Sequence, residues 1–86
     1  MTLRIERVSD GGKTTLRVSG RIGWEHLVEL RAEVEGMGVG TVLDLEHLTL
    51  VDVEGVRFLG ECEAQGIELF HCSPYIREWI SRERHR

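Results

Sequence analysis

The chain has few cysteines, which excludes a fold held together by disulfides. Its 86 residues contain two, Cys62 and Cys72, and a single pair without close spacing cannot make a disulfide framework. One alternative role for the cysteines is a reactive thiol at Cys72, which lies beside His71 and next to a predicted helix start. Zinc binding by His47, His71, Cys62 and Cys72 is another, but their spacing matches no metal-binding signature. We expect no metal and no other cofactor.

The chain also lacks a long apolar run. No stretch approaches the roughly 18 apolar residues of a membrane-spanning helix, and the start Met1-Thr-Leu-Arg-Ile5 does not resemble a secretory signal. We therefore expect a cytoplasmic protein with reduced thiols and no direct membrane insertion. A phosphate-binding loop is missing too, because Gly36, Gly38 and Gly40 end a predicted helix and no Lys-Ser or Lys-Thr follows them. This weighs against nucleotide binding.

Positive charge is in short supply. The net charge of −4 argues against binding to nucleic acid. Residues 77–86 are an exception, with four Arg and two Glu, and we interpret them as a last helical turn whose cations suit the helix dipole. Asp44, Asp52 and Glu54 are accompanied by no base, nucleophile or oxyanion pattern. We expect no enzymatic activity.

What the sequence does contain is a regular succession of short patterns. Apolar and polar residues alternate around Leu3 and Ile5 and again around Leu16 and Val18, which predicts two strands joined by a turn at 9–12. Leu27, Leu30, Val34 and Met37 then follow at helical spacing. The remaining elements are a strand at Thr41–Leu45, a linker at Glu46–Val51, a helix at Val53–Ala64, a strand at Ile67–Phe70 and a helix starting at Ser73-Pro74.

These patterns predict a single α/β domain over residues 1–86. The order strand–strand–helix–strand–helix–strand–helix favours a small mixed sheet, in which an N-terminal antiparallel hairpin adjoins parallel strands and helices pack on the sheet. Trp24 and Trp79 are the bulky residues of two amphipathic helices, so we expect them in the core. The alternative is that they are exposed anchors for a partner.

The order of elements and three short motifs resemble the STAS domain. The motifs are Leu-Arg-Val-Ser-Gly-Arg at 16–21, Val-Leu-Asp-Leu at 42–45 and Asp-Val-Glu-Gly at 52–55. STAS domains form the fold of bacterial anti-sigma factor antagonists and of cytoplasmic domains in sulfate transporters. The resemblance runs from about Leu3 to Ile80, and the ending at 72–80 is similar to that of a compact single-domain subgroup.

The resemblance implies a docking site at the start of the helix that begins near Val53. In sigma-regulating members the preceding strand is followed by Asp-Ser-Ser-Gly or Asp-Ser-x-Gly, and the partner anti-sigma kinase phosphorylates the first serine. Asp52 and Gly55 match this motif, whereas Val53 stands at the phosphoacceptor position and cannot be phosphorylated. The implied partner-binding residues are Thr49, Asp52, Val53, Glu54, Gly55, Arg57 and Phe58.

Several of these residues also have purely structural interpretations. Asp52 is suited to capping the helix, and Glu54 to its dipole, although Glu54 could instead act as a fixed anion in place of phosphoserine. Gly55 indicates close approach either of a partner or of a neighbouring strand. Thr49 is a candidate to be phosphorylated in place of the missing serine, with a structural role as the default.

Two functions follow from the resemblance. The first is a non-enzymatic module that binds an anti-sigma factor, its kinase or a similar signalling protein, without the usual control by phosphorylation. The alternative is an accessory STAS subunit that binds the ATPase of an ABC-type lipid or anion transport system. Whether the chain forms a homodimer is left open.

Overall fold

The N-terminal part of the chain is an antiparallel hairpin. The structure, a computed structural model, describes residues 3–36 and 40–85. Strands β1 (Arg4–Asp10) and β2 (Lys13–Ile22) pair from Arg4 opposite Ser19 to Asp10 opposite Lys13. Gly11 and Gly12 form the turn with φ of 57° and 85°, which other residues rarely adopt. The hairpin predicted from the sequence is confirmed.

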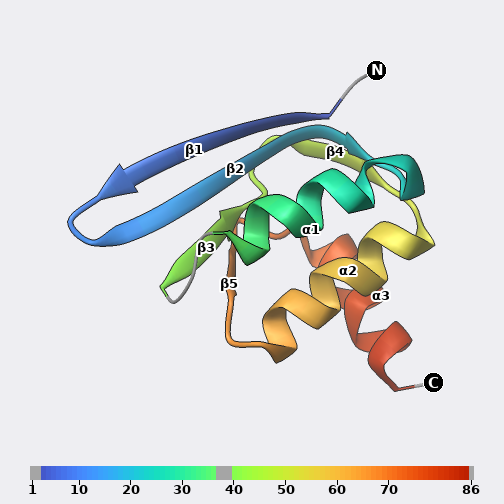
Figure 1. The fold of residues 1–86 in the computed structure, drawn as a ribbon. Coiled ribbons are helices and arrows are strands. Elements are labelled where there is room, and N and C mark those ends of the chain that lie inside the picture. The colour runs from blue at the N-terminus through green and yellow to red at the C-terminus, as the bar shows by residue number, and fades with distance from the viewer. Residues whose placement is uncertain (1–2, 37–39, 86) are drawn as a thin grey trace.

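Strand β2 is the strand on which the sheet is built. Its first half pairs in parallel with β3 (Thr41–Asp44), and its last residues pair in parallel with β4 (Leu48–Val51). Strand β5 (Glu68–Phe70) lies parallel to β3 on the far side, so the order is β1-β2-β3-β5 with β4 also on β2 (Figure 1). The predicted mixed sheet is therefore confirmed.

The linker predicted at 46–51 is wrong in its second half, because residues 48–51 form β4. This strand is short, and its partner is the end of β2 rather than a neighbour in sequence. Gly20 makes the pairing geometrically feasible: it has a φ of 90°, the register shifts between it and Arg21, and its N–H donates to the His47 carbonyl at 3.1 Å. A bulge of this kind bends a strand, so β2 turns from β3 toward β4.

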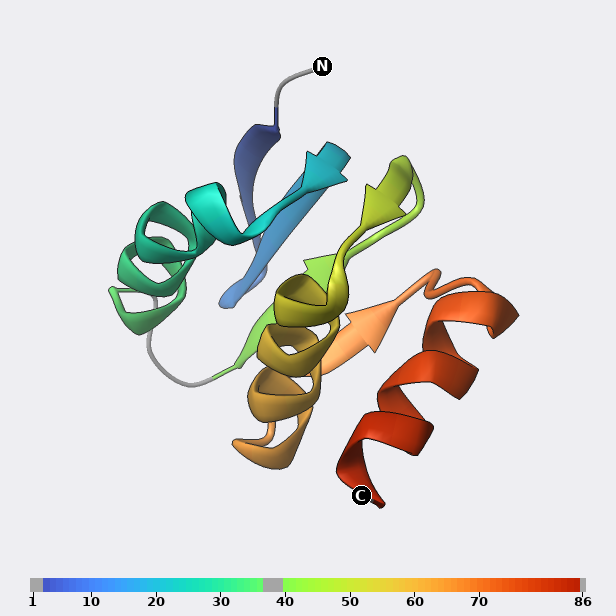
Figure 2. The same cartoon turned by 90° about the vertical axis from the view of Figure 1, so that its right-hand side faces the viewer.

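Three α-helices pack against one face of the sheet (Figure 2). A 3₁₀ turn, η1 (Trp24–His26), leads into α1 (Leu27–Glu35), and the other two helices are α2 (Val53–Ala64) and α3 (Pro74–Arg84). Their apolar faces meet the sheet in one core, whose fully buried members include Leu16, Leu30, Leu59 and Ile80. Burial of this apolar surface is the main force that holds the layers together. Met37, which was predicted to continue the apolar face of the first helix, lies outside the described residues.

The other face of the sheet carries several exposed side chains. Glu6, Arg17, Asp44 and Phe70 lie side by side in register across β1, β2, β3 and β5. Phe70 is 44% exposed, whereas the Asp44 side chain is 14% exposed. Val8, one row along on β1, is 40% exposed.

Helix α3 is held mainly by α2. Ser73 caps α3 as predicted, because its Oγ accepts a hydrogen bond from the Ile76 N–H at 3.2 Å. The Arg77 guanidinium donates to both carboxylate oxygens of Glu63 on α2, at 2.7 and 2.6 Å. In the described ranges, none of the helices is long and apolar enough to cross a bilayer.

The burial of α3 leads to a prediction about stability. Ile80 is 1% exposed, so Ile80→Ala should lower the free energy of unfolding by about 2–5 kcal/mol, because it removes buried methyl groups and leaves a cavity. Val28 on α1 is 82% exposed, and Val28→Ala should change it by no more than about 0.5 kcal/mol. Urea unfolding followed by circular dichroism measures both. Equal losses for the two variants would show that α3 is not docked on the core.

Candidate functional site

The start of α2 is organised by one carboxylate. Asp52 is the N-cap of α2, and its Oδ1 accepts a hydrogen bond from the Gly55 N–H at 2.9 Å. Its Oδ2 accepts a second hydrogen bond, from the Trp24 N–H at the start of η1, at 2.9 Å. The Asp52 N–H donates to the Ile22 carbonyl at 3.2 Å. Asp52 therefore caps its own helix, as expected, and also fixes the end of β2 and the first residue of η1 beside it.

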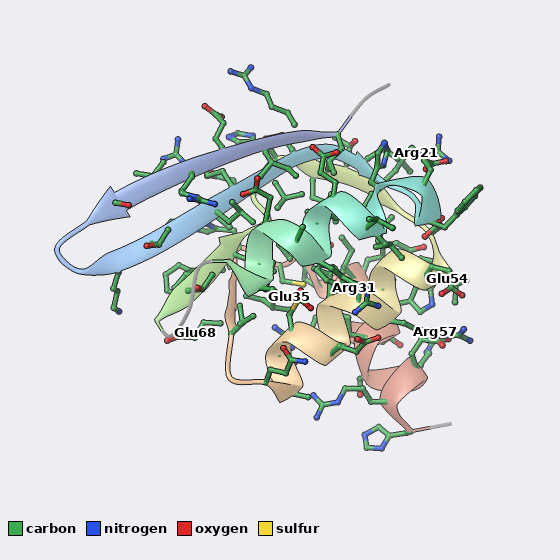
Figure 3. The ribbon with its side chains drawn as sticks, in the orientation of Figure 1. Arg21, Arg31, Glu35, Glu54, Arg57 and Glu68 are labelled. Carbon is green, nitrogen blue, oxygen red and sulfur yellow. The ribbon has the colours of Figure 1, made fainter. Side chains whose placement is uncertain are left out.

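Val53 and Glu54 form the first turn of α2. Val53 is 36% exposed and lies directly after the cap, so its side chain is available at the position where the resemblance would place a phosphoserine. The Glu54 carboxylate receives a hydrogen bond from Arg57 at 3.1 Å, and Arg57 also donates to Glu83 on α3 at 2.9 Å. Glu54 is therefore not an isolated anion, because it shares the Arg57 cation with Glu83. Figure 3 shows Glu54 and Arg57 on the same side of the molecule as Arg21.

Gly55 lies where α2 comes closest to the sheet. A Cβ at this residue would be 2.5 Å from Val51 Cγ2 and 2.9 Å from Ile22 Cγ2, distances that real Cβ atoms essentially never show. Gly55 is buried, so the strands and not a partner account for the glycine. Of the two interpretations of Gly55, tight packing of helix on strand is the one that these contacts support.

The other predicted site residues divide between surface and core. Arg57 is exposed, with a side chain at 45% relative exposure. Thr49 is exposed too, but its hydroxyl donates to the Gly20 carbonyl at 2.8 Å and so holds β4 against the bulge in β2. Phe58 is 3% exposed and its ring lies 5.2 Å from the Arg31 guanidinium carbon, so its side chain belongs to the core. We call Thr49, Asp52, Val53, Glu54 and Arg57 the helix-start surface.

Trp24 adjoins this surface, which the sequence did not predict, and its predicted place in the core is wrong. Its side chain is 69% exposed, while its N–H is bound by Asp52. Trp24 was expected to be a bulky core residue of an amphipathic helix, but it lies in a 3₁₀ turn and the α-helix begins only at Leu27. Trp79 is partly buried against the core, with its ring 5.8 Å from that of Tyr75.

The thiols are poorly suited to reactivity. Burial raises the pKa of Cys62 to about 11 and also raises the pKa of Cys72, so both favour the protonated form. In the described part of the chain, the four residues considered for zinc do not gather into one group. The group that could hold a cation is Asp44, Glu46 and His71, whose nearest ligand atoms lie within 4.8 Å of one another.

Asp44 and His71 form an ion pair at the carboxyl ends of β3 and β5. His71 Nδ1 lies 2.9 Å from Asp44 Oδ1. This hydrogen bond, together with the negative charge of Asp44, raises the pKa of His71. Burial alone would raise the pKa of Asp44, but the hydrogen bonds from His71 and the Glu46 N–H, with the charges of His71 and Arg17, lower it. The lowered pKa of Asp44 and the raised pKa of His71 widen the pH range in which both groups are charged and the ion pair is formed.

This pair makes stability depend on pH. A histidine with a raised folded-state pKa stabilises the fold below its ordinary pKa, and this contribution is lost as the pH rises through the raised value. His71→Asn, which tolerates the φ of 57° at this residue, should therefore lower the urea midpoint at about pH 5.5 and do so less at about pH 8.5. The control is His47→Asn, whose side chain is 73% exposed. A loss from His71→Asn that is independent of pH would contradict this account.

The contacts at Gly55 lead to a second prediction. Gly55→Ala should lower the free energy of unfolding by about 1–3 kcal/mol, because the new methyl group overlaps Val51 and Ile22. Gly60 is the matched control on the same helix, since its Cβ would lie 3.5 Å from Ile80 Cγ2, in ordinary contact. Gly60→Ala should leave stability unchanged or raise it by up to about 1 kcal/mol. Urea unfolding at neutral pH compares them, and equal midpoints would refute the overlap at Gly55.

Comparison with known proteins adds no family to this geometry. No protein-family model matches the chain, and no curated protein sequence matches it. The function is therefore argued from the residues and their arrangement.

Proposed function

We propose that the chain is a non-enzymatic protein-interaction module that docks on its partner through the helix-start surface. The resemblance to anti-sigma factor antagonists suggests the class of partner, an anti-sigma factor or kinase-like signalling protein. The proposal includes the corollary that docking is not controlled by phosphorylation at residue 53, because valine has no hydroxyl.

The observation that carries this proposal is the double hydrogen bond of Asp52. It ties the backbone of the exposed Trp24 to Asp52, the residue before the exposed Val53, although the two apolar residues come from distant parts of the chain. An exposed tryptophan on a fixed backbone suits a binding hot spot, because little conformational entropy is lost when a partner covers it. The surface is thus arranged before the partner arrives.

The charges around Val53 support the same function. Glu54, Arg57 and Glu83 form a continuous set of ion pairs that links the first turn of α2 to α3. The hydroxyl of Thr49 is occupied by the Gly20 carbonyl, so its phosphorylation would have to break a contact between β4 and β2. These contacts favour a surface that phosphorylation does not switch between two states.

This proposal predicts the effect of adding a charge at residue 53. Val53→Glu should weaken partner binding about tenfold or more, since it replaces an apolar contact by a carboxylate beside Glu54, as a phosphoserine would. Val53→Ser should bind more nearly like the original chain, because it adds no charge. The partner is first captured from extracts of the source cells with the immobilised chain and identified, and binding of the purified pair is then measured by titration calorimetry.

The matched control is Val8→Glu on the open face of the sheet. Val8 is 40% exposed and Val53 is 36% exposed, so both changes place a new carboxylate at a partly exposed residue. Val8→Glu should leave the dissociation constant unchanged. If Val53→Glu binds as well as Val8→Glu, the helix-start surface is not where the partner docks.

A further inference from the structure

The outward face of η1 and α1 exposes an apolar pair. Trp24 is 69% exposed and Val28, four residues later, is 82% exposed. Trp24 lies in the 3₁₀ turn η1 and Val28 in the first turn of α1, so the two exposed apolar residues are close along the chain. Leu27, Leu30 and Val34 contact the core instead. The η1–α1 segment therefore has apolar residues that pack on the core and two apolar residues that are exposed to solvent.

The same outward face is acidic. Glu25 and Glu29 flank Trp24 and Val28, and both are exposed. Within the described ranges, the ion pairs made by Arg or Lys with α1 residues are Arg7 with Glu33, at 2.8 Å, and Arg31 with Glu61, at 2.9 Å. Both pairs lie at the borders of the helix and tie it to β1 and α2. Glu25 and Glu29 are left without an arginine or lysine partner in that part of the chain.

We infer that this α1 outer face, formed by Trp24, Glu25, Val28 and Glu29, binds a basic amphipathic helix of the protein partner. Apolar side chains three or four residues apart on the partner would cover Trp24 and Val28, and Lys or Arg beside them would pair with the two carboxylates. This inference rests on the proposed function and adds the chemistry of the segment that is bound.

The charge of the face decides which occupant it fits. Carboxylates repel phosphates, so nucleic acid and anionic lipid are disfavoured. A basic helix is not repelled, and its Lys or Arg would form ion pairs with Glu25 and Glu29 at the edge of the apolar contact. Trp24 also adjoins the helix-start surface through its hydrogen bond with Asp52, so a partner seated on that surface could extend onto α1 without a gap.

The test uses a synthetic 18-residue amphipathic helix of Leu and Lys, labelled with fluorescein, and the full-length chain. Binding is followed by anisotropy at low and high salt. The double variant Glu25→Gln/Glu29→Gln should weaken binding about tenfold, and Val28→Ser should weaken it about threefold or more. Rising salt should weaken binding to the original chain more than binding to the double variant. Salt screens the carboxylates of Glu25 and Glu29, which only the original chain has.

The controls remove the same groups elsewhere. Glu46→Gln/Glu68→Gln lowers the net negative charge by the same amount, and Val8→Ser removes an exposed valine on β1. Both should bind the peptide like the original chain. If the control pair weakens binding as much as Glu25→Gln/Glu29→Gln, the peptide is attracted only by overall charge and the inference fails.

Two further outcomes separate this inference from the proposed function. If the captured partner is sensitive to Val53→Glu but not to Glu25→Gln/Glu29→Gln or Val28→Ser, the α1 outer face is not used, and the helix-start surface still stands. Sedimentation of the chain alone tests a second copy as the occupant. Self-association that is lost in Val28→Ser would assign the face to a homodimer and overturn the inference.

Discussion

The carboxylate of Asp52 is the interaction on which the arrangement of this surface depends. Its two oxygens accept hydrogen bonds from the Gly55 N–H and the Trp24 N–H, so one side chain fixes the starts of two helical segments. A helix start has unpaired N–H groups that must be satisfied, and here the residue that satisfies them in α2 also orients η1. Loss of this carboxylate would therefore free Trp24 as well as the first turn of α2.

A close approach of backbones makes this arrangement possible. The absence of a side chain at Gly55 lets α2 rest on Ile22 and Val51, and the bulge at Gly20 lets β2 reach β4 in the first place. The residues around these contacts fall into a buried group and an exposed group. Buried groups such as Phe58 hold the helices, whereas Val53, Trp24 and Val28 are left outside, and paired charges link α2 to α3.

The sequence predicted those elements whose signal is local. Helix α2 begins and ends as expected from its apolar spacing and from Asp52, and Ser73-Pro74 marks the start of α3. What the sequence could not supply was contact between distant segments. Strand β4 was missed because its four residues pair with the end of β2. The exposure of Trp24 was missed because its N–H donates to the distant Asp52 and its residue lies in a 3₁₀ turn before α1. Gly55 was noticed as unusual, but only the positions of Ile22 and Val51 show why.

The three partners of β2 have a consequence for folding kinetics. The hairpin with β1 closes locally, but the contact between Trp24 and Asp52 joins groups 28 residues apart in sequence. Contacts over such separations cost more chain entropy and form more slowly than turns and helices. We therefore expect the helix-start surface to form late in folding, after the end of β2 has paired with β4. Local opening of that short pairing would dismantle the surface while the hairpin and the packed pair of α2 and α3 stay intact.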